Sequence, residues 1–280
     1  LRNQMTKKQV IKGMYIDGRW RTGTGTFADL NPSDNSVWAT IPDGGRSETR
    51  SAIEAAQEAF YEWAEMPFTH RANHLLKVAE IWESRIPEFV AAMQSEGGGW
   101  VGKGKFEGGY VAEVFRAAAA MTYGAIGEVL PSEHGKFSTA VRYPMGVVAV
   151  ISPWNFPGIL SSRGFAFPLA AGNTIVLKPS EDTPYCGGLF FAEVMEEAGI
   201  PKGVFNVITC SRENVVKMGD ELIENPLVKG VSFTGSTQVG RSIAAQCGAY
   251  LKKCCVELGG KDSLIVRADA GLSTLVDLRY

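Results

Sequence analysis

The feature that most constrains this chain is a regular alternation, from residue 147 onward, of short apolar runs and segments with helical periodicity. The apolar runs, which we expect to be strands, are residues 147–151, 174–177, 204–208, 230–233 and 254–256. The segments that we expect to be helices lie near residues 159–171, 184–198, 213–224 and 237–250. Strands that are apolar along their whole length are buried on both faces, which is typical of a parallel sheet covered by helices. The pattern predicts an α/β fold with a Rossmann-like, doubly wound parallel sheet.

The sequence from residue 47 to about 127 is different, because it reads as successive helices. Ile53, Ala56, Phe60 and Trp63, for example, recur at spacings of three and four residues, which places them on one helix face. We therefore expect N-terminal strands and helices that wrap the sheet as part of the same domain (1–136), one further strand (137–146), the sheet core (147–269) and an atypical tail (270–280).

Composition excludes several classes of function. The 280 residues carry a net charge of −2 with basic and acidic residues interleaved, which indicates neither nucleic acid nor a membrane as partner. We expect a cytoplasmic protein with reduced thiols, because the five cysteines form no paired framework and the polar N-terminus lacks the apolar core of a signal peptide. His70 and His74 are four residues apart, but no glutamate follows His70, and we expect no metal site.

In a doubly wound sheet, ligands bind beyond the carboxyl ends of the strands. Four of the five loops expected there have distinctive sequences: Ser152-Pro-Trp-Asn-Phe-Pro157, Lys178-Pro-Ser-Glu181, Phe233-Thr-Gly-Ser-Thr-Gln-Val-Gly240 and Glu257-Leu-Gly-Gly-Lys261. In the third of these, Gly235 permits close backbone approach, and a helix that starts at Thr237 would point its amides at an anion. The spacing is not that of the usual G-x-G-x-x-G fingerprint, and an ordinary helix capped by Ser236 or Thr237 is the alternative.

The other three loops carry polar side chains suited to particular tasks. Glu181, beside Lys178, could accept hydrogen bonds from both hydroxyls of a ribose and would repel a 2′-phosphate, although a solvated Lys–Glu pair is the alternative. Asn155 lies between two prolines, which suits an amide that donates to an oxyanion, or simply a turn residue. Glu257 follows a strand that we expect to be buried and precedes two glycines, so it suits a general base or a capping carboxylate.

Together, in this order and spacing, the four loops resemble the aldehyde dehydrogenase superfamily, and the resemblance runs from about residue 15 to 269. It implies catalytic roles for Asn155, at the oxyanion, and Glu257, which activates water. It implies cofactor contacts from Ile151, Ser152, Pro153, Trp154, Lys178, Ser180, Glu181, Phe233, Thr234, Gly235, Ser236, Val239, Gly240, Leu258 and Gly259. The implied cofactor is NAD rather than NADP, and the implied reaction converts an aldehyde, NAD and water to a carboxylic acid and NADH.

The resemblance also implies partners. Residues 131–135 are most similar to enzymes that act on aromatic aldehydes such as benzaldehyde or vanillin. Residues 137–146 are similar to the family's oligomerisation arm, so we expect a homo-oligomer or pairing with another subunit.

One element of the family pattern is missing. The family's nucleophile is a cysteine in a Gly-Gln-x-Cys setting after the glutamate, and none of the 23 residues after Glu257 is cysteine. We expect all the cysteines except Cys210 to be buried as small apolar residues. The chain is therefore expected to be the NAD-binding part of the fold, without the catalytic domain and inactive alone. The alternatives are a catalytically dead nucleotide-binding or subunit-pairing module and a truncated gene relic.

Overall fold

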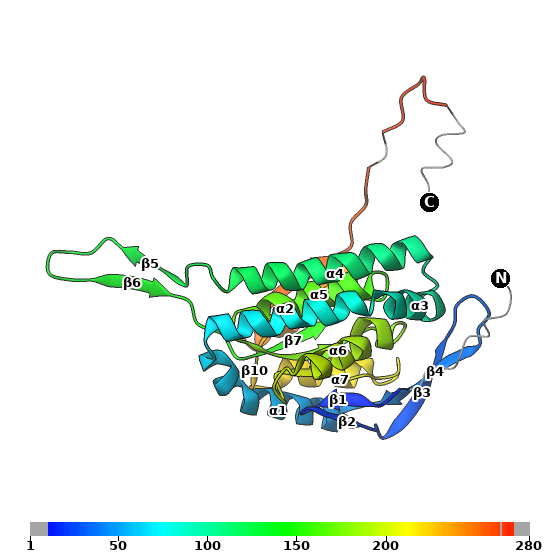
Figure 1. The fold of residues 1–280 in the computed structure, drawn as a ribbon, viewed down its shortest axis with the longest axis horizontal. Helices are drawn as coiled ribbons and strands as arrows, with labels where there is room; N and C mark the ends of the chain where they lie inside the picture. The colour runs from blue at the N-terminus through cyan, green and yellow to red at the C-terminus, as the bar shows by residue number, and fades with distance from the viewer. Residues whose placement is uncertain (1–10, 264, 272–280) are drawn as a thin grey trace.

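The computed structural model describes residues 11–263 and 265–271, and its centre is a seven-stranded sheet (Figure 1). Five strands of this sheet are parallel: β7 (Val147–Ile151), β8 (Thr174–Lys178), β9 (Phe205–Val207), β10 (Val228–Gly235) and β11 (Lys253–Leu258). The strand order β11-β10-β7-β8-β9 continues into an antiparallel pair, β1 (Met14–Ile16) and β2 (Arg19–Arg21). The predicted α/β fold is confirmed, and all five predicted core strands are present.

Helices cover both faces of the sheet, as the apolar strands require. On one face lie α1 (Arg46–Glu65), α7 (Val215–Glu224) and α8 (Thr237–Ala249). On the other lie α2 (Phe68–Ser84), α3 (Ile86–Glu96), α4 (Val101–Met121), α5 (Pro157–Ala170) and α6 (Phe190–Ala198), the last preceded by a π-helical turn, Tyr185–Leu189. At the centre of this second layer the Trp82 indole stacks on Phe191 with 4.5 Å between ring centroids, and its Nε1 donates to the carbonyl of Gly108 at 2.9 Å.

Two antiparallel hairpins lie outside the central sheet. One consists of β3 (Gly25–Leu30) and β4 (Val37–Asp43). The other consists of β5 (Gly127–Leu130) and β6 (Ser138–Val141), and it projects from the body of the molecule (Figure 1). The strand expected within residues 137–146 is β6, and its partner β5 was not predicted. Within the described residues, no helix is long and apolar enough to cross a membrane.

The structure corrects the expected burial of β11 and of the cysteines. Cys186 and Cys247 are buried as expected, but Cys254 is only partly buried and Cys255 is exposed, whereas Cys210 is buried. β11 is an edge strand with β10 as its one neighbour in the described part of the chain, so most of its side chains face solvent. The expectation that Glu257 follows a buried strand was wrong for the same reason.

Besides the backbone pairing of β1 with β9, one buried side-chain amide links the antiparallel pair to the parallel sheet. Asn206, in β9, is fully buried. Its Oδ1 accepts from the backbone amide of Asp17 at 3.0 Å, and its Nδ2 donates to the carbonyls of Ile175 (3.1 Å) and Gly203 (2.7 Å). The side chain therefore satisfies polar groups of the β1–β2 turn, of β8 and of the turn before β9.

Replacing Asn206 with Ala should destabilise the fold, because it leaves these backbone groups unpaired in the interior. An unpaired buried polar group costs about 1–3 kcal/mol, so we expect the free energy of unfolding to fall by about 2 kcal/mol or more. Thermal and urea denaturation followed by circular dichroism would measure the change. Asn73→Ala, at an exposed position of α2, is the control and should be nearly neutral. Equal stabilities of the two variants would contradict the role of Asn206.

Candidate functional site

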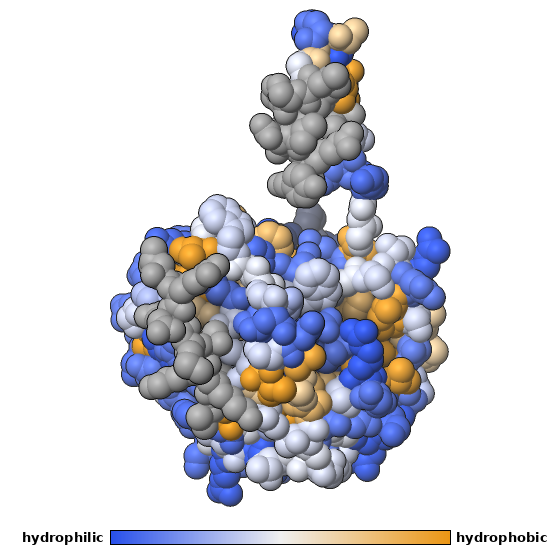
Figure 2. Space-filling view, turned by 90° about the vertical axis from the view of Figure 1, so that its right-hand side faces the viewer, coloured by the Kyte–Doolittle hydropathy of each residue, from blue (hydrophilic) through white to orange (hydrophobic). Residues whose placement is uncertain are grey.

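A cavity of about 530 Å³ lies at the carboxyl ends of β7, β8 and β10, with α7 and α8 on its other side. β7 begins soon after β6, so the parallel strands start near the β5–β6 hairpin and run away from it (Figure 1). Their carboxyl ends lie on the side of the molecule that Figure 2 presents. That side is mainly hydrophilic, and its hydrophobic residues form small groups (Figure 2). The cavity thus lies where a doubly wound sheet binds its ligands.

The backbone register explains why distant loops meet at this cavity. Ile151 in β7 is paired with Lys178 in β8 on one side and with Phe233 in β10 on the other. The loop that follows each strand therefore starts at the same level of the sheet. As a result, the structure brings together, around one cavity, the predicted cofactor residues Ile151, Ser152, Pro153, Trp154, Lys178, Ser180, Glu181, Phe233, Thr234, Gly235, Ser236 and Val239.

Three predicted cofactor residues, Gly240, Leu258 and Gly259, do not line the cavity. Gly240 packs against β11, because a Cβ at this position would lie 2.2 Å from Cδ2 of Leu258. Gly259 accepts a long hydrogen bond (3.5 Å) from the Thr237 hydroxyl. In this structure these residues hold α8 against β11.

The N-terminus of α8 is consistent with both interpretations of its sequence, an anion site and an ordinary capped helix. Ser236 is the N-cap, and its Oγ accepts from the amide of Val239 at 3.3 Å. The amides of Thr237 and Gln238 have no acceptor within the described residues. A helix start with free amides beside a cavity is suited to an anion, because the amides and the helix dipole both favour negative charge.

Lys178 and Glu181 form a largely buried rather than a solvated pair, in which the Glu181 side chain is 19% exposed. The Lys178 side chain is only 5% exposed; its Nζ donates to the carbonyl of Pro179 at 3.0 Å and lies 3.7 Å from Oε2 of Glu181. Oε1 of Glu181 accepts from Nε of Arg212 at 3.0 Å. Burial raises the pKa of the Glu181 carboxyl, but its own amide, Lys178 and Arg212 outweigh that effect and lower the pKa overall. Glu181 is therefore an anion at neutral pH.

Asn155 lies in the loop between β7 and α5, and it is exposed. The buried carboxylate of Glu107, on α4, fixes the end of this loop by accepting from the amides of Gly158 (3.0 Å) and Ile159 (3.3 Å). Burial raises the pKa of Glu107, although Lys103, at 3.1 Å, opposes the effect. The sequence analysis did not find this anchor.

Glu257 lies near the end of β11, at the same end of the sheet as Asn155, and its side chain is exposed. Neither Asn155 nor Glu257 lines the cavity. The two predicted catalytic residues therefore lie at the same end of the sheet as the cavity but outside its lining, and no hydrogen bond joins them.

Sequence reasoning also missed the helical wall of the cavity. This wall consists of Val215, Val216, Gly219, Asp220 and Ile223 from α7 and Gln238, Ser242, Ile243 and Gln246 from α8. A signal was present, because Val215, Gly219 and Ile223 recur every four residues and so form one helix stripe. Gly219 has open space beside it, so its missing side chain leaves room in the cavity.

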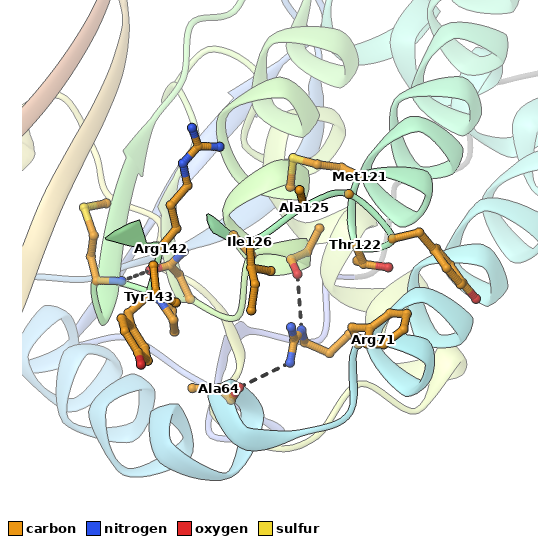
Figure 3. A pocket seen from close by; sticks show the side chains of 17 residues that line it. Ala64, Arg71, Met121, Thr122, Ala125, Ile126, Arg142 and Tyr143 are labelled. Carbon is orange, nitrogen blue, oxygen red and sulfur yellow. Dashed lines mark hydrogen bonds between the residues drawn. The ribbon is translucent and has the colours of Figure 1, made fainter. Parts of the chain in front are cut away.

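A second cavity, of about 720 Å³, lies at the foot of the β5–β6 hairpin, beside the amino ends of β7 and β8 and so at the opposite end of these strands from the loops (Figure 3). Two arginines, Arg71 and Arg142, line it. Arg71 donates to the carbonyls of Ala64 (3.3 Å) and Ala170 (3.2 Å), so its guanidinium is already used to join helices. No group of three or more potential metal ligands occurs within residues 11–263 and 265–271.

Comparison with known proteins agrees with this arrangement. The sequence profile of the aldehyde dehydrogenase family matches residues 20–278. A vanillin dehydrogenase from a Pseudomonas species is 41% identical over 255 residues, which are 90% of this chain and 52% of that protein. The crystal structure of a salicylaldehyde dehydrogenase from Pseudomonas putida G7 with salicylaldehyde superposes with a TM-score of 0.90 at 34% identity, over 95% of this chain and 55% of that one.

An Escherichia coli NADP-dependent enzyme is also similar, with a TM-score of 0.86 and 34% identity over 89% of this chain and 52% of its own. The chain therefore spans about half the length of the relatives it matches. Because the family profile covers nearly the whole sequence, the chain belongs to the aldehyde dehydrogenase family.

Proposed function

We propose that the cavity binds NAD and that the whole protein oxidises an aldehyde to a carboxylic acid. The observation that carries this proposal is the convergence of most of the predicted cofactor residues on one cavity. The site also fits the chemistry of a dinucleotide. The free amides of Thr237 and Gln238 would hold its diphosphate, and the Glu181 carboxylate would accept hydrogen bonds from the adenosine ribose.

When bound, the nicotinamide supplies a hydride acceptor, and this chain's residues would orient and polarise the reactants around it. We assign the Asn155 amide to the oxyanion that forms on the substrate carbonyl, where a preset donor lowers the barrier. We assign Glu257 to removal of a proton from the attacking water. The exposed positions of both side chains leave them accessible to a substrate.

The 280 residues, in our proposal, supply the cofactor site but not the nucleophile. None of the five cysteines lines the cavity. Burial raises the pKa of Cys210 to about 11, and burial with the neighbouring Cys254 raises that of Cys247 to about 12, so both remain thiols near neutrality. The same observation favours the second candidate, a catalytically dead nucleotide-binding or subunit-pairing module.

All five cysteines are free, which supports a reducing compartment such as the cytoplasm.

We propose an aromatic aldehyde as the substrate class. Support comes from aromatic side chains at the N-terminal end and in the first half of α4, and from Phe156, which lies directly before α5 and next to Asn155. Trp100 is 73% exposed and Phe106 is 59% exposed, and Tyr110 and Phe156 are partly open to solvent on the same elements. Two of the similar proteins are named for aromatic aldehydes, vanillin and salicylaldehyde.

We further propose that the β5–β6 hairpin joins subunits. Its apolar side chains face solvent in the single chain: Phe137, next to β6, is 79% exposed, and Val129 and Val141 are 69% and 44% exposed. An exposed strand pair with apolar side chains is a common route to association.

The cofactor proposal predicts that the purified chain binds NAD more tightly than NADP and that Glu181→Gln reduces the preference by about tenfold. The amide is a weaker acceptor for the ribose hydroxyls and no longer repels a 2′-phosphate, and one charged hydrogen bond corresponds to about that factor. Isothermal titration calorimetry with both dinucleotides would measure the two dissociation constants.

Glu58→Gln, at an exposed position of α1 away from the cavity, is the control and should leave the preference unchanged. Tighter binding of NADP than of NAD by the unaltered chain would rule out our assignment of Glu181.

The same sample, given NAD and benzaldehyde, should produce no NADH. Sustained NADH production would contradict the proposal that the nucleophile is not among these residues.

The hairpin proposal predicts that the chain forms oligomers and that Val129→Asp weakens them, because a charge would be buried in an apolar interface. Size-exclusion chromatography with light scattering would measure the mass over a range of concentrations. Val37→Asp, which introduces the same charge at an exposed position of β4, should have no effect on it. A monomer of 30.2 kDa at all concentrations, or an oligomer that tolerates Val129→Asp, would contradict the proposal.

A further inference from the structure

An arginine that the sequence analysis did not single out lies beside the carboxylate assigned to the ribose. Arg212 donates through Nε to Glu181 at 3.0 Å, and its terminal nitrogen lies 3.4 Å from Oδ2 of Asp182. Lys178 lies on the other side of Glu181. Two cations, Lys178 and Arg212, thus face two carboxylates, Glu181 and Asp182, and the four charges of this group balance. Without Arg212 the group would be negative.

The loop around Arg212 is held by several hydrogen bonds, and the Arg212 side chain is largely exposed. Arg212 lies in the connection between β9 and α7, and the Asp43 carboxylate at the end of β4 holds that connection. Asp43 accepts from the amide of Ser211 at 2.7 Å, from its hydroxyl at 2.9 Å and from Nδ2 of Asn214 at 3.1 Å. The Arg212 side chain itself is 74% exposed. Its backbone position is therefore set beside Glu181, while the guanidinium is able to change partner.

The charge arrangement has a consequence for a dinucleotide that carries a 2′-phosphate on its adenosine ribose. Such a phosphate would come close to Glu181, whose charge opposes it. A guanidinium matches phosphate with two parallel hydrogen bonds. The Arg212 side chain is 74% exposed, and an ion pair to so exposed a group contributes little to stability, so exchange of its partner costs little.

We propose that Arg212 is a specificity-determining residue of this site: it turns from Glu181 to the 2′-phosphate and gives the site an affinity for NADP that Glu181 alone would abolish. The inference rests on the proposed function, because it requires the adenosine ribose to lie at Glu181. The inference goes beyond the proposed function, because the degree of discrimination between NAD and NADP is assigned to the balance between Glu181 and Arg212 rather than to Glu181 alone.

A double-mutant cycle tests the proposal in the full chain. The unaltered protein, Glu181→Gln, Arg212→Gln and the double variant are titrated with NAD and NADP by calorimetry. Arg212→Gln should weaken NADP binding about tenfold or more, the usual worth of a charged hydrogen bond, and change NAD binding less than about threefold. Glu181→Gln should strengthen NADP binding about tenfold when Arg212 is present and less than about threefold when it is absent.

Arg116→Gln is the control, because Arg116 is a partly exposed arginine that also has two carboxylate partners, Glu83 and Glu113, but it lies on α4. It should leave both affinities unchanged. The NADP affinity that depends on Arg212 should also fall more steeply with salt than the NAD affinity.

The outcomes separate the two proposals. If the unaltered chain binds neither dinucleotide, the proposed function fails, and the inference fails with it. If it binds NAD but Arg212→Gln weakens NAD and NADP equally, the proposed function stands and the inference is overturned. An equal gain in NADP affinity from Glu181→Gln with and without Arg212, or no detectable NADP binding in Glu181→Gln, would also overturn it.

Discussion

The hydrogen-bonded register of the parallel strands is the constraint on which the rest of this structure depends. Because β7, β8 and β10 run in one direction and are aligned at Ile151, Lys178 and Phe233, the loops that follow them start at one edge of the sheet. Those loops are far apart in sequence, yet they form one cavity. The site is therefore a consequence of strand pairing, and the loops supply its chemistry.

Charge at this edge is organised by loops from both halves of the chain. Lys178 and Glu181 follow β8, Arg212 follows β9, and Asp43, at the end of β4, fixes the loop that carries Arg212. The hairpin β3–β4 is thus tied to the cofactor cavity although it lies outside the central sheet. Glu107, on α4, fixes the loop that carries Asn155 in a similar way, by accepting a hydrogen bond from the amide of Gly158. Buried or partly buried carboxylates position the loops, and more exposed side chains are left to contact ligands.

The sequence was sufficient to predict the sheet core and three loops that line the cavity, whereas the fourth predicted loop, after β11, lies outside the lining. Apolar strands of about five residues separated by helices permit few other folds, and ligand sites in such folds follow the strand ends. The α7 wall of the cavity was missed, because local periodicity does not indicate which helix closes over which loop. Arg212 was missed because its placement depends on Asp43, 168 residues before Ser211, and no local pattern links the two. The burial of Cys254 and Cys255 was mistaken because a strand's position in the sheet, central or edge, is not encoded in its own residues.

The most direct test of the account is a crystal structure of this chain with NAD. The account predicts that the adenosine ribose hydroxyls lie within about 3 Å of the Glu181 carboxylate, a hydrogen-bond distance, and that the diphosphate contacts the amides of Thr237 and Gln238. A dinucleotide bound elsewhere, for example at the foot of the β5–β6 hairpin, or an empty cavity at saturating NAD, would contradict it.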